Sequence, residues 1–437
     1  MLLVSKIKTY ITKSEFARHV LTLMSGTGLA QVIAVLASPV ITRLFTPEDF
    51  GILASYTALV GILSALVCGR YEYAIVLPKK DEDAANIVYL CLGIIVFTSV
   101  VVFVGVIFGR QWVSSCFKAP VLSSWLWLLP VSLLLVGLNQ TFNYWNLRQK
   151  GFKNMAFSRI SNISSYSIIS ISLGALTNMG AVGLLGATLF GSFISILVLI
   201  TGAIKGQIAY FLEHFSRAKI IQMAEEYKKF PVYSILPSLF DNATLAMPVL
   251  FFTKFFDSGI TGYYSLGMRI IYLPVSLIGV SISQVFHQKI ASTQAATGEI
   301  SYYVEQVFQK LVLVAILFLV VMLSAPFWFE IVFGSQWTVA GKYVMILAPG
   351  VALQFIVSPI SVVFGVRNRQ ELAAVWKVIS LVSTAFFLGI SLPFADPEYS
   401  LYFLVINDIF IYSLYLYLIF RISSASIKRA LFAFALR

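Results

Sequence analysis

GILASYTALVGILSALVCG, residues 51–69, runs for nineteen residues without a charged side chain and ends directly before Arg70-Tyr71-Glu72. A helix of about 20 predominantly apolar residues crosses the roughly 30 Å hydrocarbon core of a bilayer, where the helix must satisfy its own backbone polar groups. The stretch therefore predicts a membrane-spanning helix. It also raises the question of what Arg70 and Glu72 do at its end, before the charged run 79–83.

The same pattern recurs along the whole chain. Of its 437 residues, 59% are hydrophobic and only 11% are charged, with a mean hydropathy of +0.88, whereas soluble domains carry about 25% charged residues. We therefore predict an all-α integral membrane protein. Its twelve spans are expected near residues 18–43, 51–76, 84–109, 121–146, 156–178, 181–203, 231–256, 261–286, 307–333, 338–365, 372–394 and 400–421.

Lysine and arginine are distributed unevenly between alternate loops. Of the 31 such residues, 25 fall on the side that holds both termini, 5 fall on the other side, and Arg269 lies inside a span. Cytoplasmic loops carry this kind of excess, so both termini are predicted to be cytoplasmic in a protein of the cell inner membrane. The net charge of +12 then mainly reflects the basic residues that set the orientation of the chain in the membrane. It favours contact with anionic membrane lipids and argues against nucleic-acid binding.

The sequence shows no catalytic or metal-binding signature. The three cysteines and three histidines lie far apart, so we expect no disulfide framework, no metal site and no cofactor. No phosphate-binding loop, nucleophile elbow or zinc-protease motif is present. The predicted external loops are also too short for a catalytic domain. We therefore do not expect an enzyme.

The spans fall into two halves around the longest cytoplasmic connection, residues 204–230, which mixes basic and apolar residues as an amphipathic surface helix does. Two matches between the halves indicate a parallel internal repeat: Arg43-Leu44-Phe45 with Lys254-Phe255-Phe256, and Arg148-Gln149-Lys150 with Arg367-Asn368-Arg369. The predicted organisation is a cytoplasmic segment at 1–16, six-helix bundles at 17–203 and 231–421, and a basic cytoplasmic tail at 422–437.

Charges inside the spans are the main functional signal, because an unpaired charge at a helix centre costs about 2.5–3.5 kcal/mol on insertion scales. Arg269 is expected roughly 12 Å below the external surface, and Asp241 roughly 15 Å from the cytoplasmic side. The two residues would lie at similar heights. Two interpretations remain open: a structural ion pair between neighbouring helices, or a cation that faces a central cavity and binds an anionic cargo.

Two further polar groups also have alternative interpretations. Asp408 beside Asn407 indicates a polar stripe in the last span, facing the bundle interior, and interhelical hydrogen bonds explain it equally well. In the fourth span, Gln140, Asn143, Tyr144 and Trp145 form a polar and aromatic group suited to sugars, or an interfacial aromatic belt.

Several segments of the chain resemble bacterial oligosaccharide flippases of the Wzx type. The resemblance covers nearly all twelve spans, and its most specific part is the first hundred residues. It is carried by PVITRLFTPEDFGILASYTALVGILSALVCGRYEYAIVLPKKDEDA from Pro39, WNLRQKGFKNMAFSRI at 145–160 and GYYSLGMRIIYLPVSLIGVSISQVFHQKIA at 262–291. These flippases belong to the multidrug/oligosaccharidyl-lipid/polysaccharide exporter superfamily.

The resemblance implies a V-shaped pair of six-helix bundles around a central cavity. By alternating access, such a protein would move a polyprenyl-diphosphate-linked oligosaccharide from the cytoplasmic to the periplasmic leaflet, for O-antigen, lipopolysaccharide or capsule synthesis. The implied partners are this lipid-linked oligosaccharide, membrane lipids, the polysaccharide polymerase with its chain-length machinery, and a coupling proton or sodium ion, for which Asp241 and Asp408 are candidates.

Within this picture Arg70 is predicted to face the cytoplasmic mouth of the cavity and to receive the diphosphate, unless it is an ordinary cytoplasmic anchor paired with Glu72. Arg43, with Glu48 and Asp49, would lie at the outer mouth, with Lys254 at the corresponding place in the second half. These residues form either an external gate or a plain interfacial cluster. A drug or organic-cation antiporter of the same superfamily is the alternative function. It would prefer buried carboxylates, whereas the clearest deep charge here is the cation Arg269, accompanied by Asp241 and Asp408.

Overall fold

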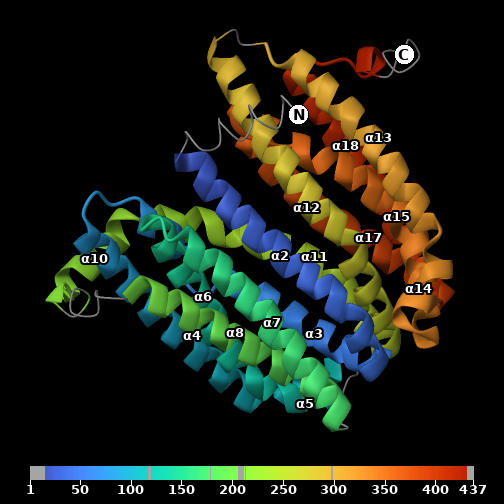
Figure 1. Ribbon diagram of the computed structural model, residues 1–437, viewed down its shortest axis with the longest axis horizontal. Helices are drawn as coiled ribbons and strands as arrows, with labels where there is room; N and C mark the ends of the chain where they lie inside the picture. Colours follow the sequence, from blue (N-terminus) through green and yellow to red (C-terminus); the bar gives the residue numbers. More distant parts are fainter. Residues whose placement is uncertain are drawn as a thin grey trace. The chain divides into compact units, whose positions relative to one another are not determined.

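The protein is described here by a computed structural model, which describes residues 15–116, 120–177, 179–204, 211, 213–296 and 299–430. Within these residues every regular element is a helix (Figure 1). Ten of the described segments are long and apolar enough to cross a membrane. The expectation of an all-α, multi-span membrane protein is therefore confirmed.

The chain divides into two compact units, Met1–Asn242 and Ala243–Arg437, with the division inside helix α11. The first unit contains α2 (Glu15–Leu44), α3 (Pro47–Ser64), the 3-10 helix η1 (Tyr71–Val76), α4 (Asp81–Cys116), α5 (Pro120–Trp125), η2 (Leu126–Leu128), α6 (Leu129–Arg148), α7 (Phe152–Leu176), α8 (Ala181–Ile204), α10 (Arg217–Glu226) and the first part of α11 (Lys229–Phe255). The second contains the rest of α11, α12 (Ser258–Ala296), α13 (Ser301–Leu323), α14 (Ala325–Phe333), η3 (Ser335–Trp337), α15 (Thr338–Ile360), α16 (Val363–Val366), α17 (Gln370–Ser391), η4 (Leu392–Phe394) and α18 (Pro397–Ser423). The proposed bundle boundaries at 203 and 231 stay predictions.

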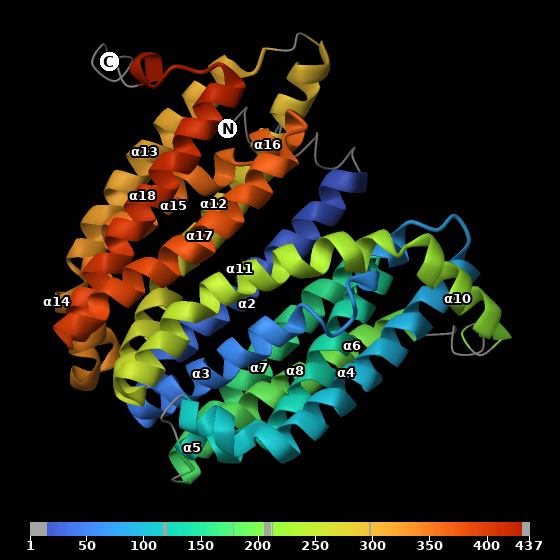
Figure 2. The ribbon, with the colours of Figure 1, turned by 180° about the vertical axis from the view of Figure 1, so that it is seen from behind.

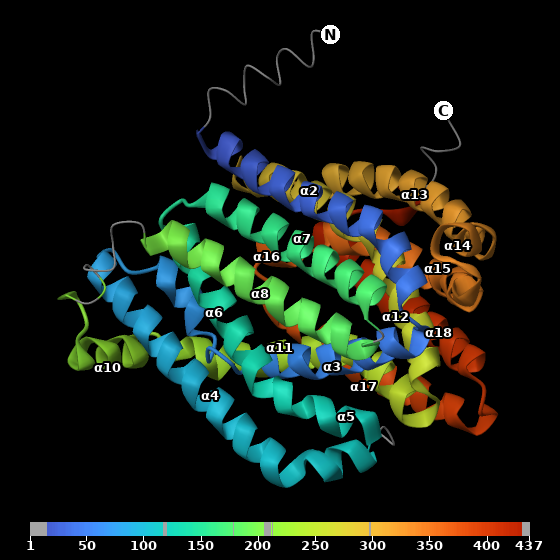
Figure 3. The ribbon, with the colours of Figure 1, turned by 60° about the horizontal axis from the view of Figure 1, so that its bottom comes forward.

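In the first unit α7 packs between α2 and α8, and α6 packs against both α4 and α8 (Figures 1 and 3). Its core cluster is built on Trp145 of α6, Ile87 and Ile95 of α4, Val67 in the turn after α3, and Ile75 of η1. Trp145, Ile75 and Val67 are fully buried. The core of this unit therefore extends to the point where the second predicted span ends.

In the second unit α15 is the central helix, with α12, α13, α14 and α18 packed against it (Figure 2). Its core cluster joins Phe252 of α11 and Tyr264 of α12 to Tyr343 and Leu347 of α15 and Leu401 of α18. Small residues on α15 permit this packing. A Cβ on Gly350 would lie 3.0 Å from Cβ of Asp408 on α18.

Within the described residues each of the twelve predicted spans falls on helical segments, but not always on a single helix: the fourth covers α5, η2 and α6, the ninth covers α13 and α14, and the tenth covers α15 and α16. Two other spans need comment. The second span was predicted as one helix over 51–76, and this is wrong, because α3 ends at Ser64 and the chain turns before η1. The fifth span coincides with α7, which, like α3, is not among the ten apolar segments. Its many serines, with Asn154 and Asn162, lower its hydropathy.

Parts of the predicted terminal and linker segments lie outside the described residues, namely 1–14, 205–210, 212 and 431–437. Within the linker the described helix is α10, which packs against α4. Met223 of α10 is buried, whereas Ile221 is 62% exposed. This helix therefore has apolar side chains on an outer as well as an inner face.

Candidate functional site

The second span is interrupted at a strained turn. Gly69 and Arg70 have φ angles of 58° and 64°, in the left-handed region. This conformation costs about 1–2 kcal/mol for a residue with a Cβ, and such strain persists only where the surroundings fix it, often at functional sites. Hydrogen bonds from Gly69 N to Leu66 O (3.0 Å) and from Tyr71 N to Cys68 O (3.1 Å) hold the turn.

The turn places two charged side chains inside the first unit. Arg70 is 9% exposed and Glu72 is 2% exposed. Nη1 of Arg70 lies 3.5 Å from Oε1 of Glu72 and donates a hydrogen bond of 3.0 Å to the hydroxyl of Tyr73. Within the described part of the chain, Nε of Arg70 and Oε2 of Glu72 have no hydrogen-bond partner. The ion pair is thus loose, and both groups retain unused hydrogen-bonding capacity.

Aromatic rings surround this ion pair. The guanidinium carbon of Arg70 lies 5.6 Å from the ring centroid of Tyr73. The Tyr73 ring meets the Tyr144 ring edge to face, with centroids 5.2 Å apart, and Phe230 lies 6.3 Å from it. We call Arg70, Glu72, Tyr73, Tyr144 and Phe230 the Arg70 cluster. A cation with planar rings beside it can bind phosphate and stack against sugars.

Arg148, at the end of α6, binds the segment that follows the turn, residues 75–81. Its Nη1 donates to the carbonyl oxygens of Ile75 (3.1 Å) and Pro78 (2.8 Å). Its Nε and Nη2 both lie 2.8 Å from Oδ1 of Asp81, the first residue of α4. From the sequence, Arg148 was interpreted only as a cytoplasmic loop charge and as part of the internal repeat. Its role depends on carbonyl groups that the fold brings within reach, so no pattern of residue types could have revealed it.

Helix α10 is anchored to this same end of the unit. Tyr71 donates its hydroxyl to Ala224 O (3.0 Å), and Nζ of Lys219 lies 3.0 Å from Oε2 of Glu82 and 3.6 Å from Oδ1 of Asp83. The hydrogen bond that Lys219 donates to Glu82 raises the pKa of Lys219 above its ordinary value. The chain before α10 is held as well, because Tyr89 donates to Phe211 O at 2.8 Å.

The polar and aromatic group predicted on the fourth span is divided in the structure. Tyr144 joins the Arg70 cluster, whereas Asn143 donates to Oδ1 of Asn139 at 3.0 Å, and Asn139 donates to Oγ of Ser195 on α8 at 2.9 Å. Trp145 is fully buried. Consecutive helical residues differ by about 100° in direction, so Asn143, Tyr144 and Trp145 cannot all share one face. Asn143 belongs to a hydrogen-bonded network within the bundle.

The remaining predicted site residues lie on other elements. Arg43 is exposed in the last turn of α2. Lys254 is half-buried near the end of α11, with its ammonium nitrogen 5.3 Å from the Phe255 ring centroid. Asp241 lies on α11 in the first unit, and Arg269 lies on α12 in the second, each half-buried. Their pairing stays a prediction.

Asp408 is half-buried on α18 and packs against Gly350 of α15. Its neighbour Asn407 is buried, accepts a 2.6 Å hydrogen bond from Ser383 and donates a 3.2 Å bond to Thr384, both on α17. Asn407 therefore makes the interhelical bonds that one interpretation of this stripe required. Among the described residues, no group of three or more His, Cys, Asp or Glu side chains is placed to hold a metal ion.

These features define a class of protein, a helical, multi-span membrane protein, and the solved structures similar to this chain include membrane transporters of the same fold. An inward-facing multidrug resistance MATE family transporter of the MOP superfamily aligns with a TM-score of 0.67 at 16% identity, over 92% of this chain and 95% of that one. The lipid II flippase MurJ, in an inward closed conformation, aligns with a TM-score of 0.70 at 15% identity, over 94% of this chain and 89% of that one.

A MOP superfamily transporter from Pyrococcus furiosus also aligns, with a TM-score of 0.56 at 15% identity, over 92% of this chain and 94% of that one. Identities this low show a shared fold. A family model described as "Polysaccharide biosynthesis protein" matches residues 40–342. The chain belongs to this family, and the resemblance found in the sequence is confirmed at the level of family and fold. No curated protein matches the chain.

Proposed function

We propose that this protein is a flippase that moves polyprenyl-diphosphate-linked oligosaccharide from the cytoplasmic to the periplasmic leaflet of the bacterial inner membrane. Both termini face the cytoplasm in this proposal. The observation that carries it is membership of a polysaccharide biosynthesis family together with a membrane transporter fold. The product of such a step would be used for O-antigen, lipopolysaccharide or capsule synthesis. The protein acts by alternating access rather than as an enzyme.

The Arg70 cluster is the proposed binding site for the diphosphate. A guanidinium can give two parallel hydrogen bonds to phosphate oxygens, which are charge-assisted and short. Nε of Arg70 has no partner in the described protein, and its contact with Glu72 is 3.5 Å long. A phosphate oxygen would therefore complete the hydrogen bonding of Arg70 instead of displacing a strong bond.

The other site residues complete this proposal. Tyr73 and Tyr144 offer aromatic surface to the first sugar, because their rings lie next to the Arg70 guanidinium. Arg269 is proposed to face the path of the cargo deeper in the membrane, and Arg43 and Lys254 to lie at its outer end. Asp241 and Asp408 are the candidate carboxylates for a coupling proton or sodium ion.

The direct experiment is to deplete the protein in its host and measure lipid-linked oligosaccharide on each face of the inner membrane. We expect the intermediate to accumulate on the cytoplasmic face, and wild-type protein to restore its transfer. In a host without a redundant flippase, unchanged distribution of the intermediate after depletion would overturn the proposal.

A drug or organic-cation antiporter is the second candidate, favoured by the alignment with a multidrug transporter over most of both chains. Buried Glu72 and half-buried Asp408 would then bind the cation or the coupling proton. Efflux of a fluorescent organic cation from cells that express the protein tests this function. Efflux without any change in lipid-linked oligosaccharide would favour the antiporter.

A further inference from the structure

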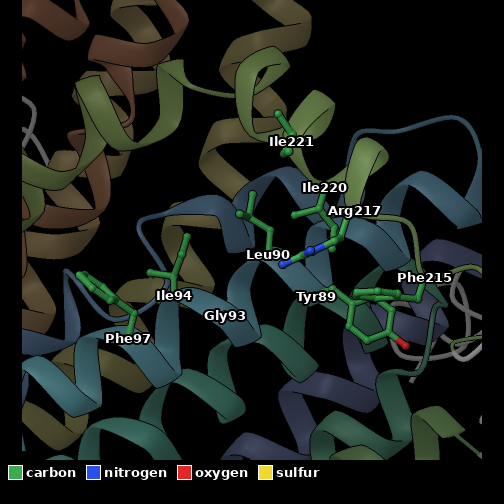
Figure 4. Close-up of a pocket in the computed structure, with 9 residues that line it drawn as sticks. All are labelled: Tyr89, Leu90, Gly93, Ile94, Phe97, Phe215, Arg217, Ile220 and Ile221. Atoms are coloured by element: carbon green, nitrogen blue, oxygen red, sulfur yellow. The ribbon is translucent and has the colours of Figure 1, made fainter.

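An apolar groove of about 570 Å³ lies between α4 and α10 in the first unit (Figure 4). The wall on α4 includes Leu90, Gly93, Ile94 and Phe97, and the wall on α10 includes Ile220 and Ile221. Among the described residues that line the groove, the charged one is Arg217, the first residue of α10. The groove therefore combines apolar walls with a cation at one end of the α10 wall.

The groove continues an apolar face of α4. Phe97 is 69% exposed, and Val100, Val104 and Phe108 continue the exposed row along the helix, with Phe108 at 84%. These residues recur at intervals of three and four, which places them on one side of a helix. Because α4 is long and apolar enough to cross a membrane, this exposed apolar row is suited to contact with lipid chains. A lipid chain that follows this row reaches the groove directly.

The shape of the groove depends on Gly93. A Cβ built at this position would meet no heavy atom within 4 Å, so the space beside the helix is open there. Leu90, Ile94 and Ile220 bound this space with apolar carbon. An open, apolar space in contact with the lipid-facing side of a span suits a hydrocarbon chain better than a polar ligand.

Arg217 supplies charge complementarity to a lipid headgroup. Within the described part of the chain its side chain makes no hydrogen bond or ion pair, whereas the side chain of Lys219 on the same helix is bonded to Glu82 and Asp83. An exposed arginine at the edge of a membrane protein extends its head toward the headgroup region. The cytoplasmic leaflet carries anionic lipids, and each nearby cation contributes about 1 kcal/mol to their attraction.

We propose that this groove binds one anionic phospholipid, with an acyl chain between α4 and α10 and the phosphate on Arg217. The single guanidinium matches one phosphate group rather than the diphosphate of the proposed cargo. A lipid bound in this way contacts both helices and stabilises the attachment of α10 to α4. The site lies beside the hydrogen bond from Tyr71 to Ala224, and thus beside the segment that carries the Arg70 cluster.

The proposal can be tested by native mass spectrometry of the purified full-length protein with phosphatidylglycerol or phosphatidylcholine as the added lipid. We expect wild-type protein to retain one phosphatidylglycerol in preference to phosphatidylcholine. Arg217→Gln should reduce this preference about five-fold, the factor that corresponds to about 1 kcal/mol. Gly93→Phe fills the groove and should abolish retention of either lipid.

Arg110→Gln is the matched control, because Arg110 lies near the other end of α4, with its guanidinium carbon 4.9 Å from the Trp127 ring centroid. It should keep the wild-type preference. Equal binding by wild type and Arg217→Gln would overturn the proposal, as would unchanged retention in Gly93→Phe. A groove that retained a polyprenyl diphosphate in preference to phosphatidylglycerol would also overturn it, since its occupant would then be the cargo. None of these outcomes depends on measured flipping.

Discussion

Arg148 binds the first residue of α4 through two of its nitrogens, because Nε and Nη2 both lie 2.8 Å from Oδ1 of Asp81. The remaining Nη1 binds two backbone carbonyl groups, those of Ile75 and Pro78. One side chain therefore connects the end of α6, the segment after the broken span and the start of α4. The ion pair with Asp81 and the hydrogen bonds to the two carbonyl groups should contribute differently to stability. The Asp81 side chain is half exposed, whereas the hydrogen bonds to the carbonyl groups are partly buried.

Arg148→Ala should destabilise the protein more than Asp81→Asn does. The alanine variant leaves two carbonyl groups without their donor, which costs about 1–3 kcal/mol for each group that is buried and unsatisfied. The asparagine variant removes only the charge of a carboxylate that is 53% exposed, and exposed ion pairs contribute about 0–1 kcal/mol. The Tm of each variant, measured by thermal unfolding in detergent, compares the two losses of stability. Equal losses of Tm in the two variants would show that the ion pair is the main interaction.

The fold was predictable to a large extent, because hydrophobic length is a local property. A span such as α8 contains almost nothing but apolar residues, so its position follows from the sequence. The break after Ser64 was not predictable in the same way. Residues 65–69 are as apolar as those before them, and the turn depends on Arg70 adopting a left-handed conformation that the surrounding unit fixes.

The candidate site was predictable only in part. Arg70 and Glu72 were found because two charges at the end of an apolar run are unusual. Tyr73 belongs to the Arg70 cluster, and Tyr144 joins it whereas Asn143 does not. These outcomes depend on the direction of each side chain. That direction is set by the orientation of α6 about its axis and by the turn at Gly69 and Arg70, and neither can be read from residue types alone.

Arg70→Gly combined with Glu72→Gln should separate the structural role of this turn from its role in transport. Glycine adopts a φ of 64° without strain, and glutamine avoids leaving a buried, unpaired carboxylate in place of the ion pair. We expect normal abundance and unchanged or higher thermal stability, with loss of lipid-linked oligosaccharide transfer. Sidedness of the intermediate in depleted cells measures transfer.

Glu72→Gln alone is the control for this double variant, because it keeps the cation that is proposed to bind phosphate. It should retain more transfer than the double variant does. If the double variant restored transfer to the wild-type level at normal abundance, Arg70 would be only a structural anchor. The proposed phosphate contact would then be wrong.

Gly137→Ala should weaken the core of the first unit. A Cβ at this position would overlap Cγ1 of Val67 and would lie 2.6 Å from Cγ1 of Ile95, and both of these side chains are buried and branched. Such overpacking typically costs about 1–3 kcal/mol. Gly105→Ala on α4 is the matched control, since its Cβ would meet nothing within 4 Å, and alanine favours a helix by up to about 1 kcal/mol. A Tm for Gly137→Ala equal to that of Gly105→Ala would contradict the packing argument.

Arg269→Ala tests whether the cation on α12 acts on the cargo. A hydrogen bond between charged groups contributes about 1.5–3 kcal/mol, so its loss should reduce transfer about tenfold or more at unchanged abundance. Arg269→Lys should retain part of the activity if charge alone matters, and little if two parallel bonds to phosphate are required. Lys342→Ala serves as the control, because that lysine forms an ion pair with Glu398 on α18 and is half exposed. Wild-type transfer by Arg269→Ala at normal abundance would assign Arg269 a structural role, as the alternative interpretation of a helix–helix ion pair requires.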